Sequence, residues 1–227
     1  MADKFERHIL QSWGTNATAW TDAVRNKTIA SRAEVTNRAI IDAVLALKPQ
    51  SVLDIGCGEG WLVRALAGHA SRLVGVDATE ALIDQARQSG DGEFYTARYE
   101  DISQCLSDQR FDVAVCNFSL LGKESVEVLL AAIPRILNDG GHLVIQTLHP
   151  RNACGDTPYR DGWREGSWKG FSRDFCDAPP WYFRTLESWI ALLTRSDLAL
   201  YHLLEPFFPD TQQPASLILV AEPTDRR

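Results

Sequence analysis

The chain has 227 residues, of which 45% are hydrophobic and 23% are charged, and its formal net charge at pH 7 is −7. This length and composition are those of an ordinary soluble globular protein with one large domain. They argue against a surface that binds nucleic acid mainly through its phosphates. No apolar run approaches the roughly 20 residues of a membrane span.

Cysteine usage gives a second set of exclusions. The five cysteines, at positions 57, 105, 116, 154 and 176, are odd in number and none forms a C-x-x-C pair. We therefore expect neither a disulfide framework nor a zinc site. The N-terminus lacks a signal-peptide pattern, so the expected compartment is the cytoplasm.

Residues 1–48 are predicted to be helical. One helix is indicated around residues 16–24, and a longer one runs from Ser31 to Leu47, where apolar residues recur on one face. Lys48-Pro49 ends this second helix, because proline cannot continue the hydrogen-bonding pattern.

The next segment, residues 52–60, reads VLDIGCGEG and is the most informative stretch of the chain. A hydrophobic strand reaches Asp54 and breaks into a loop with glycine at every second position. Glycines let the backbone turn sharply and let a ligand approach, and the N–H groups of the following helix face that ligand. The dinucleotide-binding pattern needs a third glycine where Trp61 stands, and no P-loop pattern is present. The alternative is a glycine turn that merely joins a strand to a helix.

Strands and helices then alternate along the chain. Strands are predicted at residues 51–55, 71–77, 93–97, 111–116 and 142–148, and helices at residues 61–68, 79–88 and 124–137. Hydrophobic strands that alternate with helices indicate a parallel sheet covered on both faces. Thr79 is a candidate N-cap for its helix.

The pattern changes after the fifth strand. Residues 149–184 combine aromatic side chains with glycine, proline and charges of both signs, which indicates an insertion over the carboxyl edge of the sheet. A helix at 185–195 follows, with Thr185 as N-cap and Glu187 near the capping-box position. Two final strands are predicted at residues 198–205 and 215–221.

The DIGCGEG loop resembles the first motif of the class I S-adenosylmethionine (AdoMet) dependent methyltransferases. The order of elements and the tail also resemble small-molecule methyltransferases related to the ubiquinone and menaquinone biosynthesis C-methyltransferases. This resemblance implies an α/β fold: a Rossmann-like, seven-stranded, mostly parallel sheet with helices on both faces and an antiparallel last strand. It also implies one methyltransferase domain over residues 1–227. Its parts would be a helical lid (1–48), an AdoMet-binding core (49–148), a substrate-side insertion (149–184) and a final helix and strands (185–227).

The second strand ends at Asp77, which lies 21 residues after Gly56. At that distance an acid can accept hydrogen bonds from both ribose hydroxyls of a nucleotide, and Ala78 is small enough to pack beside the adenosine. The alternative is an aspartate that forms the turn before a helix. The family resemblance assigns Asp54 to the amino end of AdoMet and the loop residues to its methionine part: Gly56, Cys57, Gly58 and Gly60.

The ends of the third and fourth strands supply further cofactor candidates. The family's usual adenine-contacting acid falls on Arg98, a departure that shifts the adenine contact to Tyr99 and Glu100. Alternatively, Glu100 simply helps to open a helix, where acids are favourable. Asn117 is predicted to bind the amino group, and Phe118 either walls the sulfonium or packs in the core.

An arginine of the N-terminal helices could clamp the AdoMet carboxylate, and Arg32 is the better candidate. The alternative for Arg32 is a solvated charge on a helix face.

His149 follows the fifth strand and is the candidate general base for an acceptor that must lose a proton. Alternatively, His149 fixes the turn into the insertion. The aromatic side chains of the insertion suggest an enclosing acceptor pocket, although most of them are expected to pack the insertion onto the sheet. The candidates for the pocket are Trp163, Trp168, Trp181 and Tyr182.

These features predict a methyltransferase that moves a methyl group from AdoMet to a small-molecule acceptor and releases S-adenosylhomocysteine (AdoHcy). The expected binding partner is that small-molecule acceptor, and nucleic acid is disfavoured as a partner. We expect no membrane span and no bound metal. The protein is expected to be a monomer or a homodimer. The alternatives are a methyltransferase that acts on protein or RNA and a non-catalytic AdoMet-binding protein.

Overall fold

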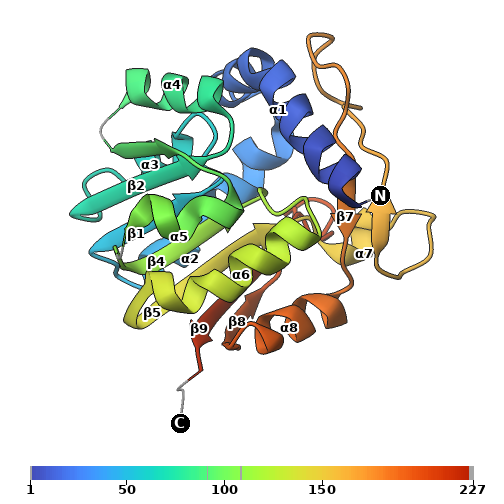
Figure 1. Ribbon diagram of the computed structural model, residues 1–227. Helices are drawn as coiled ribbons and strands as arrows, with labels where there is room; N and C mark the ends of the chain where they lie inside the picture. The colour runs from blue at the N-terminus through green and yellow to red at the C-terminus, as the bar shows by residue number, and fades with distance from the viewer. Residues whose placement is uncertain (1, 91, 108, 225–227) are drawn as a thin grey trace.

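A computed structural model describes residues 2–90, 92–107 and 109–224 of the chain. A seven-stranded sheet in the order β3-β2-β1-β4-β5-β9-β8 runs through the molecule (Figure 1). Its strands are β1 (Ser51–Ile55), β2 (Arg72–Asp77), β3 (Glu93–Thr96), β4 (Phe111–Asn117), β5 (Leu137–Thr147), β8 (Leu198–Leu204) and β9 (Leu217–Pro223).

The first five strands of this sheet pair in parallel, and β9 is antiparallel to both of its neighbours, β5 and β8. This arrangement confirms the predicted fold class, including the antiparallel last strand. Because the strand order reverses between β1 and β4, the carboxyl ends of these strands open a crevice where ligands bind in α/β sheets.

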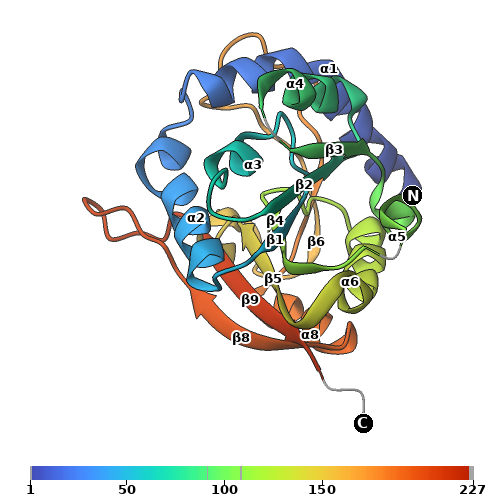
Figure 2. The ribbon, with the colours of Figure 1, turned by 90° about the vertical axis from the view of Figure 1, so that its left-hand side faces the viewer.

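Helices cover both faces of the sheet, as Figure 2 shows. One face carries α2 (Asn37–Ala46), α3 (Trp61–Ala65) and α4 (Glu80–Ser89), and the other carries α5 (Ile102–Leu106), α6 (Glu124–Ile136) and α8 (Leu186–Arg195). The larger core lies under α5, α6 and α8, where side chains such as Phe111, Leu129 and Leu193 are almost fully buried. The predicted N-cap is confirmed at α8, where the Thr185 side chain accepts a hydrogen bond from the backbone N–H of Ser188.

The long helix α1 (Ala2–Arg25) lies beside the insertion (Figure 1). The Asn16 amide donates to the backbone oxygen of Cys176 and accepts from its N–H, at 2.8 and 2.9 Å. Trp168 also packs edge-on against Trp13. The insertion itself contains α7 (Pro150–Ala153) and a small hairpin of β6 (Gly162–Arg164) and β7 (Trp181–Phe183). α1 and the insertion are thus held together over the edge of the sheet.

Two of the predicted elements begin differently in the structure. The helix predicted from Ser31 begins with a π-helical turn, η1 (Arg32–Thr36), before α2. β5 begins at Leu137 instead of His142, because a bulge in its pairing with β4 brings Leu137 opposite Phe111. Within the described residues, no helix is long and apolar enough to cross a membrane.

Candidate active site

The glycine loop after β1 turns through three left-handed residues. Gly56, Gly58 and Gly60 have φ values of 76°, 56° and 80°. A Cβ atom on Gly56 would lie 2.3 Å from the Cβ of Ser119, and one on Gly60 would lie 3.0 Å from the Cβ of Ala86. Glycine is therefore required at these two positions both by backbone conformation and by close packing.

The Asp77 carboxylate at the end of β2 holds this loop. Its Oδ2 accepts a hydrogen bond from the N–H of Gly58 at 3.0 Å, and its Oδ1 accepts from the N–H of Thr79 at 2.8 Å. Burial raises the pKa of Asp77, and the two backbone donors oppose that rise. Each carboxylate oxygen keeps a further lone pair, so Asp77 can still accept from a ligand. Thr79 occupies the N-cap position of α4, but its side chain makes no capping bond.

Two buried acceptor atoms near this loop lack hydrogen-bond partners within the described part of the chain: Oδ1 of Asp54 and Oδ1 of Asn117. Asp54 is 2% exposed. Burial, reinforced by the charge of Asp77, raises the pKa of Asp54 to about 8, while the charge of Arg32 opposes this rise. Buried acceptors without donors are costly, so both atoms are suited to a ligand that brings N–H groups.

The segment after β4 is fixed by hydrogen bonds from two directions. The Tyr99 hydroxyl donates to the backbone oxygen of Ser119 at 2.9 Å, and the Ser119 hydroxyl donates to the backbone oxygen of Ile55 at 2.7 Å. Phe118 has a φ of 54°, a strained conformation for a bulky residue of the kind that clusters at ligand sites. Tyr99 and Glu100 lie in the 3-10 turn η2 (Tyr99–Asp101) that opens α5.

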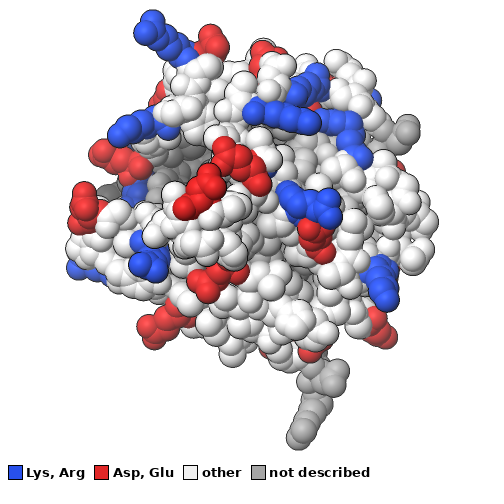
Figure 3. Space-filling view, turned by 180° about the vertical axis from the view of Figure 1, so that it is seen from behind, with Lys and Arg blue, Asp and Glu red and all other residues white. Residues whose placement is uncertain are grey.

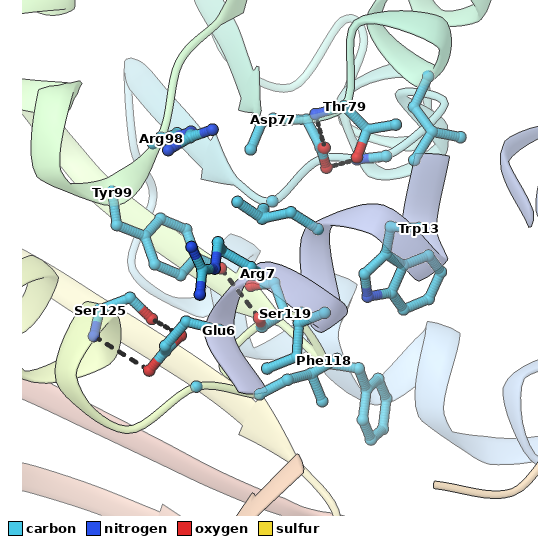
Figure 4. Close-up of a pocket in the computed structure, with 18 of the residues that line it drawn as sticks. Glu6, Arg7, Trp13, Asp77, Thr79, Arg98, Tyr99, Phe118, Ser119 and Ser125 are labelled. Carbon is cyan, nitrogen blue, oxygen red and sulfur yellow. Dashed lines mark hydrogen bonds between the residues drawn. The ribbon is translucent and has the colours of Figure 1, made fainter. Parts of the chain in front are cut away.

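A cavity of about 190 Å³ lies at this crevice, between the strand ends and α1. In Figure 4, Asp77 and Thr79 lie on one side of the cavity and Phe118 and Ser119 on the other. The predicted cofactor residues that line it are Gly56, Gly58, Asp77, Ala78, Tyr99, Glu100, Asn117 and Phe118. Asp54, Cys57 and Gly60 are buried and are not part of its lining, and Arg32 lies elsewhere. The individual contacts stay predictions.

A second cavity of about 210 Å³ adjoins the first. The two share Trp20, Phe118 and Leu121 in their walls. Of the aromatic candidates from the insertion, Trp181 and Tyr182 line the second cavity. Trp163 instead stacks on Phe5 and Trp168 packs against Trp13, as expected for residues that attach the insertion.

His149 lies outside the lining of both cavities. Its Nδ1 accepts from the N–H of Arg151 at 3.3 Å, which caps α7, and its Nε2 lies 2.7 Å from Oε1 of Glu205. Both ring nitrogens are thus engaged, a geometry that favours the turn-fixing role. The general-base role stays a prediction.

Sequence reasoning missed Glu6 of α1. Its Oε1 accepts from the N–H groups of Lys123 and Glu124 at 2.8 and 3.1 Å, and its Oε2 accepts from the Ser125 hydroxyl at 2.7 Å. The carboxylate therefore caps the N-terminus of α6, where negative charge is favourable. The sequence gives no signal for this contact because its partners lie over 110 residues away along the chain.

Glu59 was also missed, although it lies inside the glycine motif. Its carboxylate is fully buried and pairs with Arg64 at 2.6 Å and with Arg25 at 3.0 Å. Arg25 belongs to α1, so Glu59 ties that helix to the glycine loop. The sequence could have marked Glu59 as a functional residue, because it is an acid that stands between two glycines of the motif.

We expect Glu59→Ala to lower the free energy of unfolding by about 3 kcal/mol, because two charged hydrogen-bonded pairs are lost from a buried site. Urea unfolding measures this effect. Asp42→Ala is the matched control, because its pair with Arg38 is exposed and should contribute almost nothing. A Glu59→Ala protein as stable as the control variant would show that the pairs do not stabilise the loop.

The residues of the first cavity fit AdoMet. Asp77 can accept from ribose hydroxyls, and the unpartnered oxygen of Asn117 suits an amino group, as does that of Asp54, which is buried outside the lining. Within the described residues, no cluster of His, Cys, Asp and Glu is suited to a metal ion.

Comparison with known proteins agrees with this fit. Residues 53–145 match the methyltransferase domain family. The ubiquinone biosynthesis O-methyltransferase of Coxiella burnetii is 33% identical over 112 residues, which cover 48% of each chain. The enzyme of the same name from Methylococcus capsulatus is 27% identical over 144 residues, 62% of this chain and 61% of that one. The matched segments thus span about half the length of the Coxiella relative and 61% of the Methylococcus relative.

Solved structures extend the likeness beyond the core. An S-adenosylmethionine dependent methyltransferase from Mesorhizobium loti is 26% identical, with a TM-score of 0.60 over 80% of this chain and 97% of that one. The 1,6-didemethyltoxoflavin-N1-methyltransferase of Burkholderia thailandensis, solved with S-adenosylhomocysteine, is 18% identical. Its TM-score is 0.70 over 99% of this chain and 91% of that one; at this identity it supports the fold alone.

Residues 53–145 therefore belong to the class I AdoMet-dependent methyltransferases. The comparisons confirm the predicted family and the predicted cofactor, AdoMet.

Proposed function

We propose that this protein transfers a methyl group from AdoMet to a small-molecule acceptor. The observation that carries the proposal is the adjacency of the two cavities, which share Trp20, Phe118 and Leu121. A donor in the first cavity and an acceptor in the second would meet at this shared wall. The names of the curated relatives, which refer to ubiquinone biosynthesis, support a small acceptor.

AdoMet supplies an electrophilic methyl group on a positively charged sulfur. The chain's own residues have to bind the reactants, align them and exclude water. Trp20 and Phe118 bring aromatic rings to the shared wall, and aromatic faces attract cations. The mostly apolar lining of the second cavity keeps water away from the acceptor.

Transfer of labelled methyl groups tests the proposal. The protein is incubated with methyl-labelled AdoMet and fractionated cell extract, and label is expected in the small-molecule fraction. Label confined to protein or RNA would favour a macromolecular methyltransferase instead. AdoHcy binding without label in any fraction would favour the non-catalytic alternative.

For His149→Ala we expect kcat/KM within about threefold of wild type and a loss of about 1 kcal/mol of stability, because the side chain caps α7 outside both cavities. Steady-state methyl transfer and thermal unfolding measure these effects. Glu205→Ala is the control that removes the contact to Nε2 and keeps the cap. A fall in kcat beyond a hundredfold, with AdoHcy affinity unchanged, would restore the general-base role.

Surface charge is consistent with a small acceptor. Acidic and basic side chains are interspersed on the face shown in Figure 3.

We propose a cytoplasmic location for the protein. All five cysteines are free thiols, which supports this location. They stand at positions 57, 105, 116, 154 and 176.

A further inference from the structure

The charges that line the two cavities differ in kind. The first cavity carries acids and arginines together, with Glu6, Asp77 and Glu100 against Arg7 and Arg98. The second cavity is lined by two arginines, Arg32 and Arg184, and among its described lining residues there is no aspartate or glutamate. Its remaining walls are mostly aromatic and aliphatic. An apolar space with a positive lining is complementary to an apolar molecule that carries negative charge.

Arg184 is already engaged in the structure. Its Nη1 donates to the backbone oxygen of Gly122 at 2.9 Å and its Nη2 donates to that of Lys123 at 3.0 Å. Its guanidinium also stacks over the Tyr182 and Trp189 rings. These contacts fix the segment that lines both cavities, so Arg184 positions the walls.

Arg32 has fewer hydrogen-bond partners for its guanidinium than Arg184 has. It is 8% exposed, and its guanidinium lies between the rings of Trp20 and Trp61, 5.3 and 4.7 Å from their centroids. Its Nε donates to the side-chain oxygen of Asn37 at 3.1 Å, a neutral partner. Its Nη2 is buried and, among the described residues, has no hydrogen-bond partner. A buried charged donor without an acceptor is costly unless a ligand supplies one.

The acids near Arg32 do not take up this donor. Glu59 already pairs with Arg25 and Arg64, and among the described residues the Oδ1 atom of Asp54 makes no hydrogen bond to Arg32. Burial lowers the pKa of Arg32 to about 10, which still leaves it charged at neutral pH. Arg32 also opens the π-helical turn η1, a feature frequently found at functional sites.

We propose that Arg32 binds an anionic oxygen group, a carboxylate or a phosphate, on the methyl acceptor, so that the substrate class is a mainly apolar, anionic small molecule. This inference rests on the proposed function, which places the acceptor in the second cavity. It differs from the clamp on the AdoMet carboxylate that the sequence predicted, because Arg32 lines the second cavity and not the first. A guanidinium fork is suited to either anion.

Matched probes test the proposal on the AdoHcy-saturated protein: 2-naphthoate, 2-naphthyl phosphate and the neutral 2-naphthamide. Titration calorimetry is expected to show one of the anions binding the wild type at least tenfold more tightly than the amide. Arg32→Gln should abolish this preference, and Arg32→Lys should retain part of it. Arg38→Gln is the control, because Arg38 is exposed and pairs with the exposed Asp42. AdoHcy affinity should stay within about twofold of wild type in Arg32→Gln.

Two results would overturn the proposal. One is a wild type that binds neither anion more tightly than the amide, which includes a failure to bind all three; this comparison needs no variant and so does not depend on a variant folding. The other is an Arg32→Gln protein that keeps the preference for the anion and loses AdoHcy affinity at least tenfold, which would assign Arg32 to the cofactor. An AdoHcy titration of the wild type is done first. Its failure would count against the proposed function itself, separately from this inference.

Discussion

Asp77→Asn is expected to weaken AdoHcy binding about a hundredfold. If both ribose hydroxyls donate to the Asp77 carboxylate, each bond to the charged group contributes about 1.5–3 kcal/mol. Asparagine is neutral and offers one acceptor oxygen, so a loss near 3 kcal/mol follows, which is roughly a hundredfold in the dissociation constant. Calorimetric titration with AdoHcy measures this loss.

The same substitution touches the loop, so a stability control is needed. Asp77 also accepts from the N–H groups of Gly58 and Thr79, and asparagine can keep only one of these bonds. Thermal unfolding without ligand measures that cost separately, and the AdoHcy-dependent rise in Tm reports binding. Asp84→Asn removes an exposed acid on the neighbouring helix and should leave affinity unchanged. Affinity within threefold of wild type in Asp77→Asn would remove Asp77 from the cofactor site.

The sheet, and the crevice beside the glycine loop, could be predicted because the sequence patterns that indicate them are local. Hydrophobic strands alternate with amphipathic helices, and Gly56, Asp77 and Asn117 stand at the ends of β1, β2 and β4. Parallel strands bring those ends to one edge, so Gly56, Asp77 and Asn117 meet around one cavity although they are far apart along the chain.

The sequence indicated the presence of the insertion but did not predict its strand pairing or its contacts with α1. Its hairpin pairs Trp163 with Tyr182, and its connection to α1 joins Asn16 to Cys176, 160 residues away. Such contacts depend on the finished fold and leave no periodic pattern. For the same reason, Trp163 and Trp181 look alike in sequence, yet of these two only Trp181 lines the second cavity.

Arg32 illustrates how burial changes the meaning of a residue. On an ideal helix from Ser31 it could be an exposed charge, which was one of the two interpretations of the sequence. The π-helical turn η1 and the Trp20 and Trp61 rings instead enclose its guanidinium. Neither the turn nor the stacking is visible in the pattern of apolar residues, because that pattern follows the α2 face that contacts the sheet.

The pH dependence of cofactor binding is the second large effect that the structure leads us to expect. The pKa of Asp54 is raised to about 8 in the free protein, so Asp54 is mostly protonated at pH 7. A ligand ammonium beside it favours the carboxylate, so binding must expel the proton. AdoHcy affinity should therefore rise by up to about tenfold per pH unit from pH 6 towards pH 8 and level off above it.

The stability of the ligand-free protein depends on pH with the opposite sign. The folded-state pKa lies above the unfolded value, so the contribution of Asp54 to stability is greatest at low pH and is lost as the pH rises towards 8.

Calorimetry of AdoHcy binding at pH 7 in buffers of different ionisation enthalpy measures the proton directly, and release close to one proton per AdoHcy is expected. Asp54→Asn is the decisive control, because it removes the titrating group and leaves Asp77, whose pKa burial also raises. Loss of both the proton release and the pH slope in this variant assigns them to Asp54. A wild type whose AdoHcy affinity is flat between pH 6 and 8 would mean that Asp54 does not exchange its proton for the amino group, and the unpartnered oxygen of Asn117 would then remain as the candidate acceptor at that end of the cavity.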